Sequence, residues 1–108
     1  MIKLKNLLIE VVSKSEVTKL MLIKNPKTIQ AEYVRVDGKK LKEKFKVKKT
    51  SESVGYYFIT VGKAKPDPKA FNNYEFVIDK HKLIVRLRAK FGMATNAVSD
   101  NILKIKAK

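Results

Sequence analysis

Residues that carry chemistry are scarce in this chain. It has no cysteine and a single histidine, His81. The lack of cysteine excludes disulfide bridges and thiolate metal sites. A nucleophilic triad needs a base beside a Ser or Cys nucleophile, and neither the calcium-loop spacing nor the glycine-rich phosphate loop occurs. We therefore expect a protein with no enzymatic activity, no metal and no cofactor.

Long apolar segments are also missing. No run approaches the ~18 residues that span a bilayer, so no membrane span is expected. The N-terminal lysines are followed by a short apolar run that Glu10 interrupts, and no small-residue cleavage site follows. We expect no signal peptide, and a protein that is cytoplasmic or associated with a virion.

Acidic residues are few relative to basic ones. Asp and Glu number 10 against 25 Lys and Arg, so the 108-residue chain carries a net charge of +15. Its 44% of hydrophobic residues are enough for one folded domain with one core, over residues 1–108. The positive field favours an anionic partner, a class that includes nucleic acid, an acidic protein surface and a lipid face.

Short apolar runs with turn residues between them fill the chain. They cover residues 7–12, 17–23, 31–36, 41–47, 55–61, 74–78, 83–89 and 102–107. This spacing is typical of a sandwich or barrel, and it predicts an all-β domain, an antiparallel immunoglobulin-like sandwich of about seven or eight strands.

The N-terminal segment is ambiguous, because its apolar residues also fit one face of a helix. Those residues are Leu4, Leu7, Leu8, Val11 and Val12. An α+β fold with an N-terminal helix is therefore the alternative. We favour two strands, because residues 7–12 are rich in β-branched side chains and residues 13–15 resemble a turn.

Turn formers separate the expected strands. Asp37-Gly38 gives the clearest hairpin, because Gly accepts a positive φ at little cost and Asp tolerates it. Pro66 and Pro68 predict a stiff surface loop, since each proline removes a backbone donor. The turn-like stretch that contains His81 predicts a surface histidine. Asx hydrogen bonding in turns explains four isolated aspartates, Asp37, Asp67, Asp79 and Asp100.

Two stretches of the chain resemble a fibronectin type III domain. The stretch LKNLLIEVVSKSEVTKLMLI, within residues 4–24, resembles the first two strands of that family. Residues 83–108, LIVRLRAKFGMATNAVSDNILKIKAK, resemble its last two strands, with Gly92 in the loop and Ser99 just before the final strand. In the penultimate strand, the inward positions are Leu83, Val85, Leu87 and Ala89. The resemblance implies an immunoglobulin-like sandwich.

Lysine and arginine alternate with apolar residues in three of the expected strands. Because alternate side chains of a strand point to opposite faces, we expect the charges to face outward. The charged rows are Arg86, Arg88 and Lys90; Lys104, Lys106 and Lys108; and Lys42, Lys44, Lys46 and Lys48. The inward residues opposite them are Val85, Leu87, Ala89 and Phe91; Leu103, Ile105 and Ala107; and Leu41, Phe45 and Val47. Glu43 interrupts its apolar side, which predicts an edge strand or a half-buried one.

These three rows are the candidate anion-binding or partner-binding site. In a sandwich the last two strands are neighbours, and their outward faces would pool six positive charges. The row from Lys42 to Lys48 extends that patch only if its strand joins the same sheet. Like charges on adjacent strands repel, and this cost argues that the face is used. The alternative is that each row is a solvated surface that discourages edge pairing.

Tyr56 and Phe58 share one face of the expected strand at residues 55–61. Nucleic-acid bases stack on such aromatic pairs. Tyr and Phe also fill sandwich cores, and we favour the core for these two.

We expect a non-enzymatic structural or interaction module, such as an accessory (decoration-type) protein of a phage particle. It would dock through its basic face on an acidic protein surface, such as a capsid. The alternative is a nucleic-acid-binding protein that contacts phosphates without reading sequence, although no recognition helix, zinc site or paired aromatic motif of the known modules is present. Anionic lipid or polysaccharide is a third partner class, without specific support.

Overall fold

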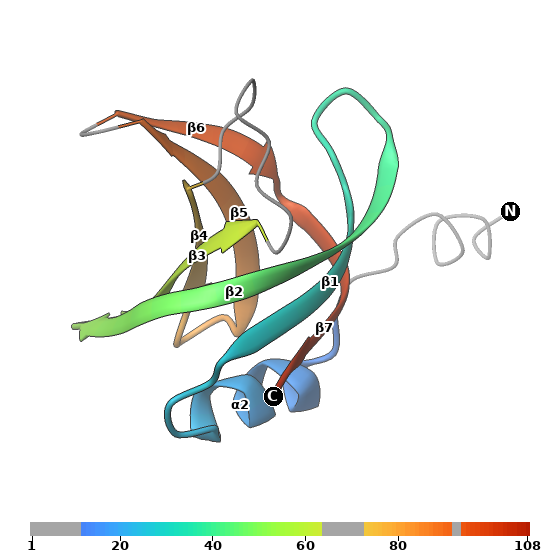
Figure 1. Cartoon of the computed structure of the whole chain (residues 1–108). Coiled ribbons are helices and arrows are strands. Elements are labelled where there is room, and N and C mark those ends of the chain that lie inside the picture. The colour runs from blue at the N-terminus through green and yellow to red at the C-terminus, as the bar shows by residue number, and fades with distance from the viewer. Residues whose placement is uncertain (1–11, 64–72, 92–93) are drawn as a thin grey trace, which may run out of the picture.

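The computed structural model describes residues 12–63, 73–91 and 94–108, and these ranges contain one helix and seven strands (Figure 1). The helix is α2 (Lys14–Leu22). The strands are β1 (Thr28–Val34), β2 (Lys40–Ser53), β3 (Tyr56–Lys63), β4 (Asn73–Asp79), β5 (Ile84–Phe91), β6 (Ala94–Ser99) and β7 (Asn101–Ala107). The prediction of an all-β domain with about seven strands is confirmed.

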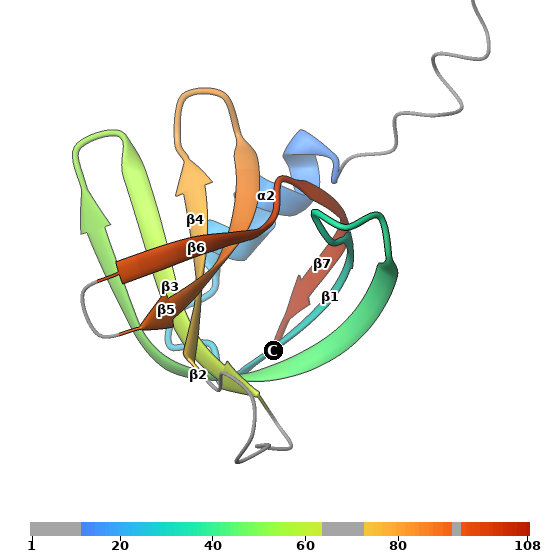
Figure 2. The ribbon, with the colours of Figure 1, turned by 90° about the horizontal axis from the view of Figure 1, so that it is seen from above.

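The strands form one antiparallel sheet in the order β6-β5-β4-β3-β2-β1-β7. Its two edge strands are consecutive in the chain, with Asp100 alone between them. The sheet therefore curls into a half-barrel, as Figures 1 and 2 show. Two hydrogen bonds join the ends of β1 and β6: Val36 N donates to the carbonyl of Val98 over 2.9 Å, and Ser99 Oγ donates to the carbonyl of Val34 over 2.5 Å.

The curl has a local cause in three register shifts, each of which leaves one residue unpaired in the ladder. These bulged residues are Lys48 in β2, Val98 in β6 and Leu103 in β7. A bulge bends its strand and increases the twist, so the sheet curls without closing. The predicted sandwich is not confirmed, because the seven described strands share one sheet.

Helix α2 replaces the strand that we expected at residues 17–23, so that prediction is wrong; residues 7–11 lie outside the described part of the chain. Ser13 caps the helix, since its Oγ accepts a hydrogen bond from Glu16 N over 3.2 Å. A serine followed three residues later by a glutamate is the sequence signature of a capping box, and this signal for a helix outweighs the β-branched content here. In the described ranges, no helix is long and apolar enough to cross a membrane.

The core lies inside the curl, and α2 packs against it with Val17 and Leu20 (Figure 2). The predicted alternation is confirmed in β5, where Val85, Leu87 and Ala89 are buried. In β2, Phe45 is buried and packs edge-on against two further aromatic rings. In β7 the prediction is wrong at one position: the bulge places Ile102, rather than the half-buried Leu103, in the core.

The hairpin predicted at Asp37-Gly38 is confirmed, and it joins β1 to β2. Gly38 has φ +94°, a left-handed conformation that costs glycine little. Arg35 N donates to the carbonyl of Lys39 over 2.7 Å and closes the turn. The loop predicted at Pro66 and Pro68 lies outside the described residues.

Candidate anion-binding face

Outward lysines of β2 and β7, together with Lys108 just after β7, flank β1 on both sides. Each lies beside an outward residue of β1 in the register of the sheet, because β1 pairs with both strands. The resulting rows are Lys46–Thr28–Lys108, Lys44–Gln30–Lys106 and Lys42–Glu32–Lys104. All six lysines are exposed. We call this group the lysine face: Lys42, Lys44, Lys46, Lys104, Lys106 and Lys108.

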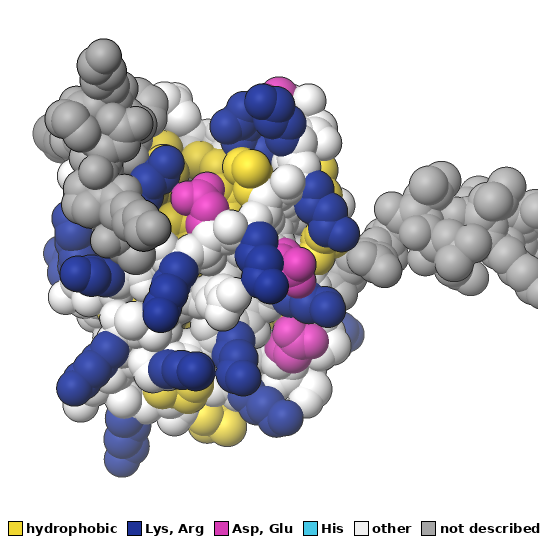
Figure 3. Space-filling model, turned by 45° about the vertical axis from the view of Figure 1, so that its right-hand side comes forward, with side chains coloured by type: hydrophobic (Ala, Val, Ile, Leu, Met, Phe, Trp, Pro, Cys, Tyr) yellow, Lys and Arg dark blue, Asp and Glu magenta, His cyan; other side chains and the backbone are white. Residues whose placement is uncertain are grey.

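Strand geometry spaces the lysine face as a regular grid. Alternate residues of one strand are about 6.6–6.8 Å apart, and strands two positions apart are separated by about 9.5 Å. Figure 3, which brings the right-hand side of Figure 1 forward, shows Lys and Arg side chains spread over that side of the molecule with few acidic side chains between them. The face is a lattice of separate positive charges.

Little of this charge is neutralised within the protein. Glu32 lies between Lys42 and Lys104, and its carboxylate is 3.9 Å from the Lys104 ammonium. The other five lysines form no ion pair with the residues that the structure describes. On the outer side of the face, a hollow of about 40 Å³ between Thr28, Lys44 and Lys106 is far smaller than a pocket for an organic ligand. A larger hollow of about 420 Å³, between β7 and α2, is bordered by Lys104 and Lys106. The face is therefore suited to a surface or a polymer.

The second charged row, Arg86, Arg88 and Lys90, lies elsewhere, so the expected pooling of the last two strands is wrong. β5 pairs with β4 and β6, whereas β7 pairs with β1. No strand was expected between residues 89 and 102, and the strand β6 takes the place beside β5. This row is also partly neutralised: Arg86 Nε is 3.7 Å from Asp100, and Lys90 Nζ is 3.5 Å from Glu75.

The ends of the β2 row also differ from the prediction. Lys48 is the bulged residue of β2, and its ammonium donates to the side-chain oxygen of Asn73 in β4, two strands from Lys46 in the same row of the sheet. At the other end, Lys40 is exposed and pairs with Val34. Lys40 was not among the predicted residues, although it has the same parity as Lys42 and extends the row by one position.

Tyr56 and Phe58 lie on the outer side of β3, so the core prediction for them is wrong. Tyr56 is 45% exposed and Phe58 is half-buried. Their rings stack, with centroids 6.1 Å apart and an interplanar angle of 25°. The inward positions of β3 are occupied by the buried residues Ile59 and Val61. Because side chains alternate along a strand, their burial identifies the intervening Phe58 as an outward residue.

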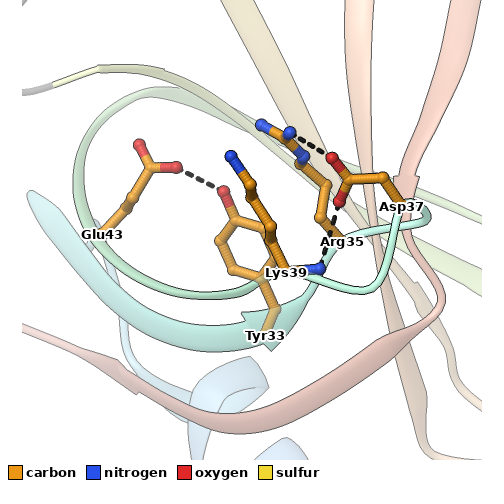
Figure 4. A network of polar contacts seen from close by, with 5 residues as sticks. All are labelled: Tyr33, Arg35, Asp37, Lys39 and Glu43. Atoms are coloured by element: carbon orange, nitrogen blue, oxygen red, sulfur yellow. Dashed lines mark hydrogen bonds and ion pairs between the residues drawn. The ribbon is translucent and has the colours of Figure 1, made fainter.

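A polar cluster inside the half-barrel was not foreseen either (Figure 4). The hydroxyl of Tyr33 in β1 donates to the carboxylate of Glu43 in β2, and Lys63 Nζ is 3.9 Å from Glu43. The Lys63 ammonium also lies 5.7 Å from the ring of Tyr74. Glu43 is half-buried as predicted, but β2 is no edge strand, because it lies between β1 and β3. Burial, and then Glu43, raise the pKa of Tyr33.

The turn that joins β1 to β2 holds a second polar contact, at the rim of the half-barrel (Figure 4). The Arg35 guanidinium donates to Asp37, and Lys39 N donates to Asp37 Oδ1 over 3.1 Å. These hydrogen bonds, first that of Arg35, lower the pKa of Asp37 to about 2. Asp37 is thus a turn residue in an Asx arrangement, as predicted.

The remaining chemistry is that of turns. His81 is exposed in the turn between β4 and β5, and its backbone N donates to Asp79 Oδ1 over 2.9 Å. This bond and one from Lys82 N confirm the Asx arrangement predicted at Asp79. Asp67 lies outside the described residues. In the described part of the chain, no group of three or more His, Asp or Glu side chains could hold a metal ion.

No family model, curated protein or solved structure matches the chain, so its function has to be argued from the chemistry of these surfaces.

Proposed function

We propose that the protein binds nucleic acid through its lysine face, by contacts to the phosphate backbone that do not read sequence. The observation that carries the proposal is the arrangement of six exposed lysines on both sides of β1, with Glu32 as the acidic residue between them. Lysine supplies a hydrated point charge on a flexible stem. Such charges neutralise phosphates by releasing counterions, which needs no shaped pocket.

The composition of the face favours nucleic acid over an acidic protein surface. Cores of protein interfaces are depleted of lysine and enriched in arginine and aromatic residues, and their binding energy is concentrated in buried anchors. The lysine face contains neither arginine nor an aromatic residue, and its three central residues are Thr28, Gln30 and Glu32. Docking on an acidic protein or a phage particle stays a prediction, as does the fibronectin type III sandwich.

The test is a fluorescence anisotropy titration with single-stranded and double-stranded DNA and RNA at several salt concentrations. We expect the logarithm of the binding constant to fall linearly with the logarithm of salt, with a slope of about −0.9 per phosphate neutralised in duplex DNA. Replacing Lys104, Lys106 and Lys108 together by Gln should reduce the magnitude of that slope by about 2–3. The corresponding variant of Lys42, Lys44 and Lys46 should do the same.

A charge-matched control is the Gln variant of Lys14, Lys24 and Lys82, which are exposed and lie outside the lysine face. It removes the same net charge, so it should leave most of the salt slope in place. An equal loss in the control would show that net charge binds, and not the face. Absence of binding to any of these nucleic acids at low salt would overturn the proposal.

A further inference from the structure

The outer side of β3, β4 and β5 carries a second surface of different chemistry. The register places Phe58 beside Val77 and Val77 beside Arg86. Tyr56 lies one outward position before Phe58 in β3, and Arg88 one outward position after Arg86 in β5. We call this group the aromatic platform: Tyr56, Phe58, Val77, Arg86 and Arg88. These residues line a shallow hollow of about 280 Å³.

The hollow is suited to a flat group. It is shallow and largely open to solvent, so it can support one face of a planar ring without enclosing the ring. The Tyr56 and Phe58 rings are close to parallel, at 25°. Aromatic faces of this kind accept nucleic-acid bases without distinguishing between them, because every base has a π face.

The two arginines leave hydrogen-bonding capacity unused. Arg88 Nε is buried and has no hydrogen-bond partner in the described part of the chain, a costly state for a polar group. The Arg86 side chain is half exposed, and its contact with Asp100 is long, at 3.7 Å. Glu75, the acidic residue of the hollow, is 3.5 Å from Lys90. A guanidinium can donate to phosphate and can also stack on a ring.

The aromatic platform continues the lysine face on the same side of the sheet. β2 connects the two surfaces, because Lys46 is part of the lysine face and Ser51 pairs with Phe58 of the platform. Because Lys48 is bulged, these two residues of β2 are four ladder positions apart, or about 14 Å. That distance corresponds to about four stacked nucleotides at 3.4 Å each, so one nucleic-acid strand can reach both surfaces.

We infer that the aromatic platform stacks unpaired bases of a single-stranded nucleic acid, while Arg86 and Arg88 contact the adjoining phosphates. This inference rests on the proposed function, and it adds a preference for single strands, since the faces of paired bases are covered by their neighbours in a duplex. A protein partner fits less well. Its interface would use about 20–30 residues a side, whereas the apolar part of this surface consists of Tyr56, Phe58 and Val77.

The test uses the double variant that combines Tyr56→Leu and Phe58→Leu. Its affinity for single-stranded oligo(dT) is compared with its affinity for duplex DNA. Leucine keeps the surface apolar but has no π face. We expect the affinity for the single strand to fall about tenfold or more, while duplex affinity and its salt slope stay unchanged. Tyr56→Leu alone should cause a smaller loss of single-strand affinity. This single variant can be measured instead if the double variant folds poorly. A control, Leu22→Ala, removes an exposed apolar side chain of α2 that is not part of the platform.

A spectroscopic readout is available because the chain has no tryptophan. In Tyr56→Trp the single indole should be quenched by oligo(dT), whereas in Val36→Trp, at an exposed turn position, it should not. Unchanged single-strand affinity in the leucine variants, or equal quenching at both positions, would overturn the platform. Loss of duplex binding in the lysine variants reports separately on the proposed function. Wild-type protein that binds neither form would overturn both.

Discussion

At the scale of single residues, the Tyr33 hydroxyl shows how the half-barrel tolerates a carboxylate on its inner side. Glu43 lies at an inward position of β2 that would otherwise be apolar. Its charge is satisfied by the Tyr33 hydroxyl and by Lys63, 3.9 Å away. A buried polar group costs little free energy only while its partners remain. Tyr33 therefore stabilises β2 through its hydroxyl as well as its ring.

Tyr33→Phe tests this role, because it keeps the ring in the core and removes only the hydroxyl. We expect the free energy of unfolding at pH 7 to fall by about 1–2 kcal/mol, since the lost hydrogen bond is made to a carboxylate. Urea denaturation followed by circular dichroism measures the change. Tyr56→Phe is the control, because its hydroxyl is on the exposed outer side, and it should change stability by less than about 0.5 kcal/mol. Equal effects of the two variants would contradict this role.

The same residue predicts a response to alkaline pH. Tyr33 has a pKa raised above its ordinary value of 10.0 in the folded protein, so the neutral phenol is the form that folding favours. Below pH 10 the phenol is neutral in both states, and its contribution to stability is fully present. As the pH rises above 10, the unfolded chain ionises first and stability falls. Denaturation curves measured on both sides of pH 10 should show a steeper loss for wild type than for Tyr33→Phe.

At the scale of elements, helix α2 is stabilised by its N-terminal cap and by packing on the core, because the helix is too short to be stable by itself. Its nine residues are too few for a stable helix in water. The Ser13 cap supplies one hydrogen bond to the first turn, and Val17 and Leu20 are buried three residues apart on one face. The sequence contained both the capping serine and the helical spacing of the apolar residues. The β-branched residues nevertheless favoured strands in the prediction. Their intrinsic propensity is weaker than capping and packing together.

Leu20→Ala should therefore destabilise the whole domain. Leu20 is 2% exposed, whereas Leu22 in the same helix is 74% exposed. Truncating a buried leucine costs about 2–5 kcal/mol through lost transfer energy and a residual cavity. Leu22→Ala, the same chemical change on the outer face, should cost less than about 0.5 kcal/mol. Thermal denaturation of the two variants decides the point: similar melting temperatures would mean that α2 is not part of the cooperative core.

Strand order was the part of the fold that local patterns could not reveal. Alternation identified the outward lysines and most of the inward residues, since it depends only on neighbours in sequence. The pairing of β7 with β1 joins residues such as Ile105 and Ala31, which are far apart in the chain. The short edge strand β6 has Val98 as its one large apolar residue, so its sequence resembles a loop. For this reason the sequence predicted each lysine of the face but not which rows would meet.

At the scale of the whole molecule, the lysine face is a source of repulsion. Two unit charges about 7 Å apart in water repel by about 0.6 kcal/mol before screening, and each strand of the lysine face holds two such neighbouring pairs. Within the described ranges, only Lys104 is near a carboxylate of this face. A net charge of +15 adds a long-range term of the same sign. The isolated protein should therefore be less stable at low salt than its packing allows.

This repulsion can be measured without any partner. The Gln variant of Lys42, Lys44 and Lys46 should melt a few degrees above wild type at low salt, and the charge-matched variant of Lys14, Lys24 and Lys82 should gain less, because those lysines are not neighbours in one strand. Near 1 M salt, where the Debye length is about 3 Å, the difference between the two variants should vanish. A difference that persisted there would mean that the lysine stems, and not their charges, determine stability.

At low salt, a polyanion that binds the folded state neutralises the same charges and stabilises that state by mass action. Duplex DNA at low salt should therefore raise the melting temperature of wild type more than that of the face variant, and the reverse order would contradict both the repulsion and the assigned face.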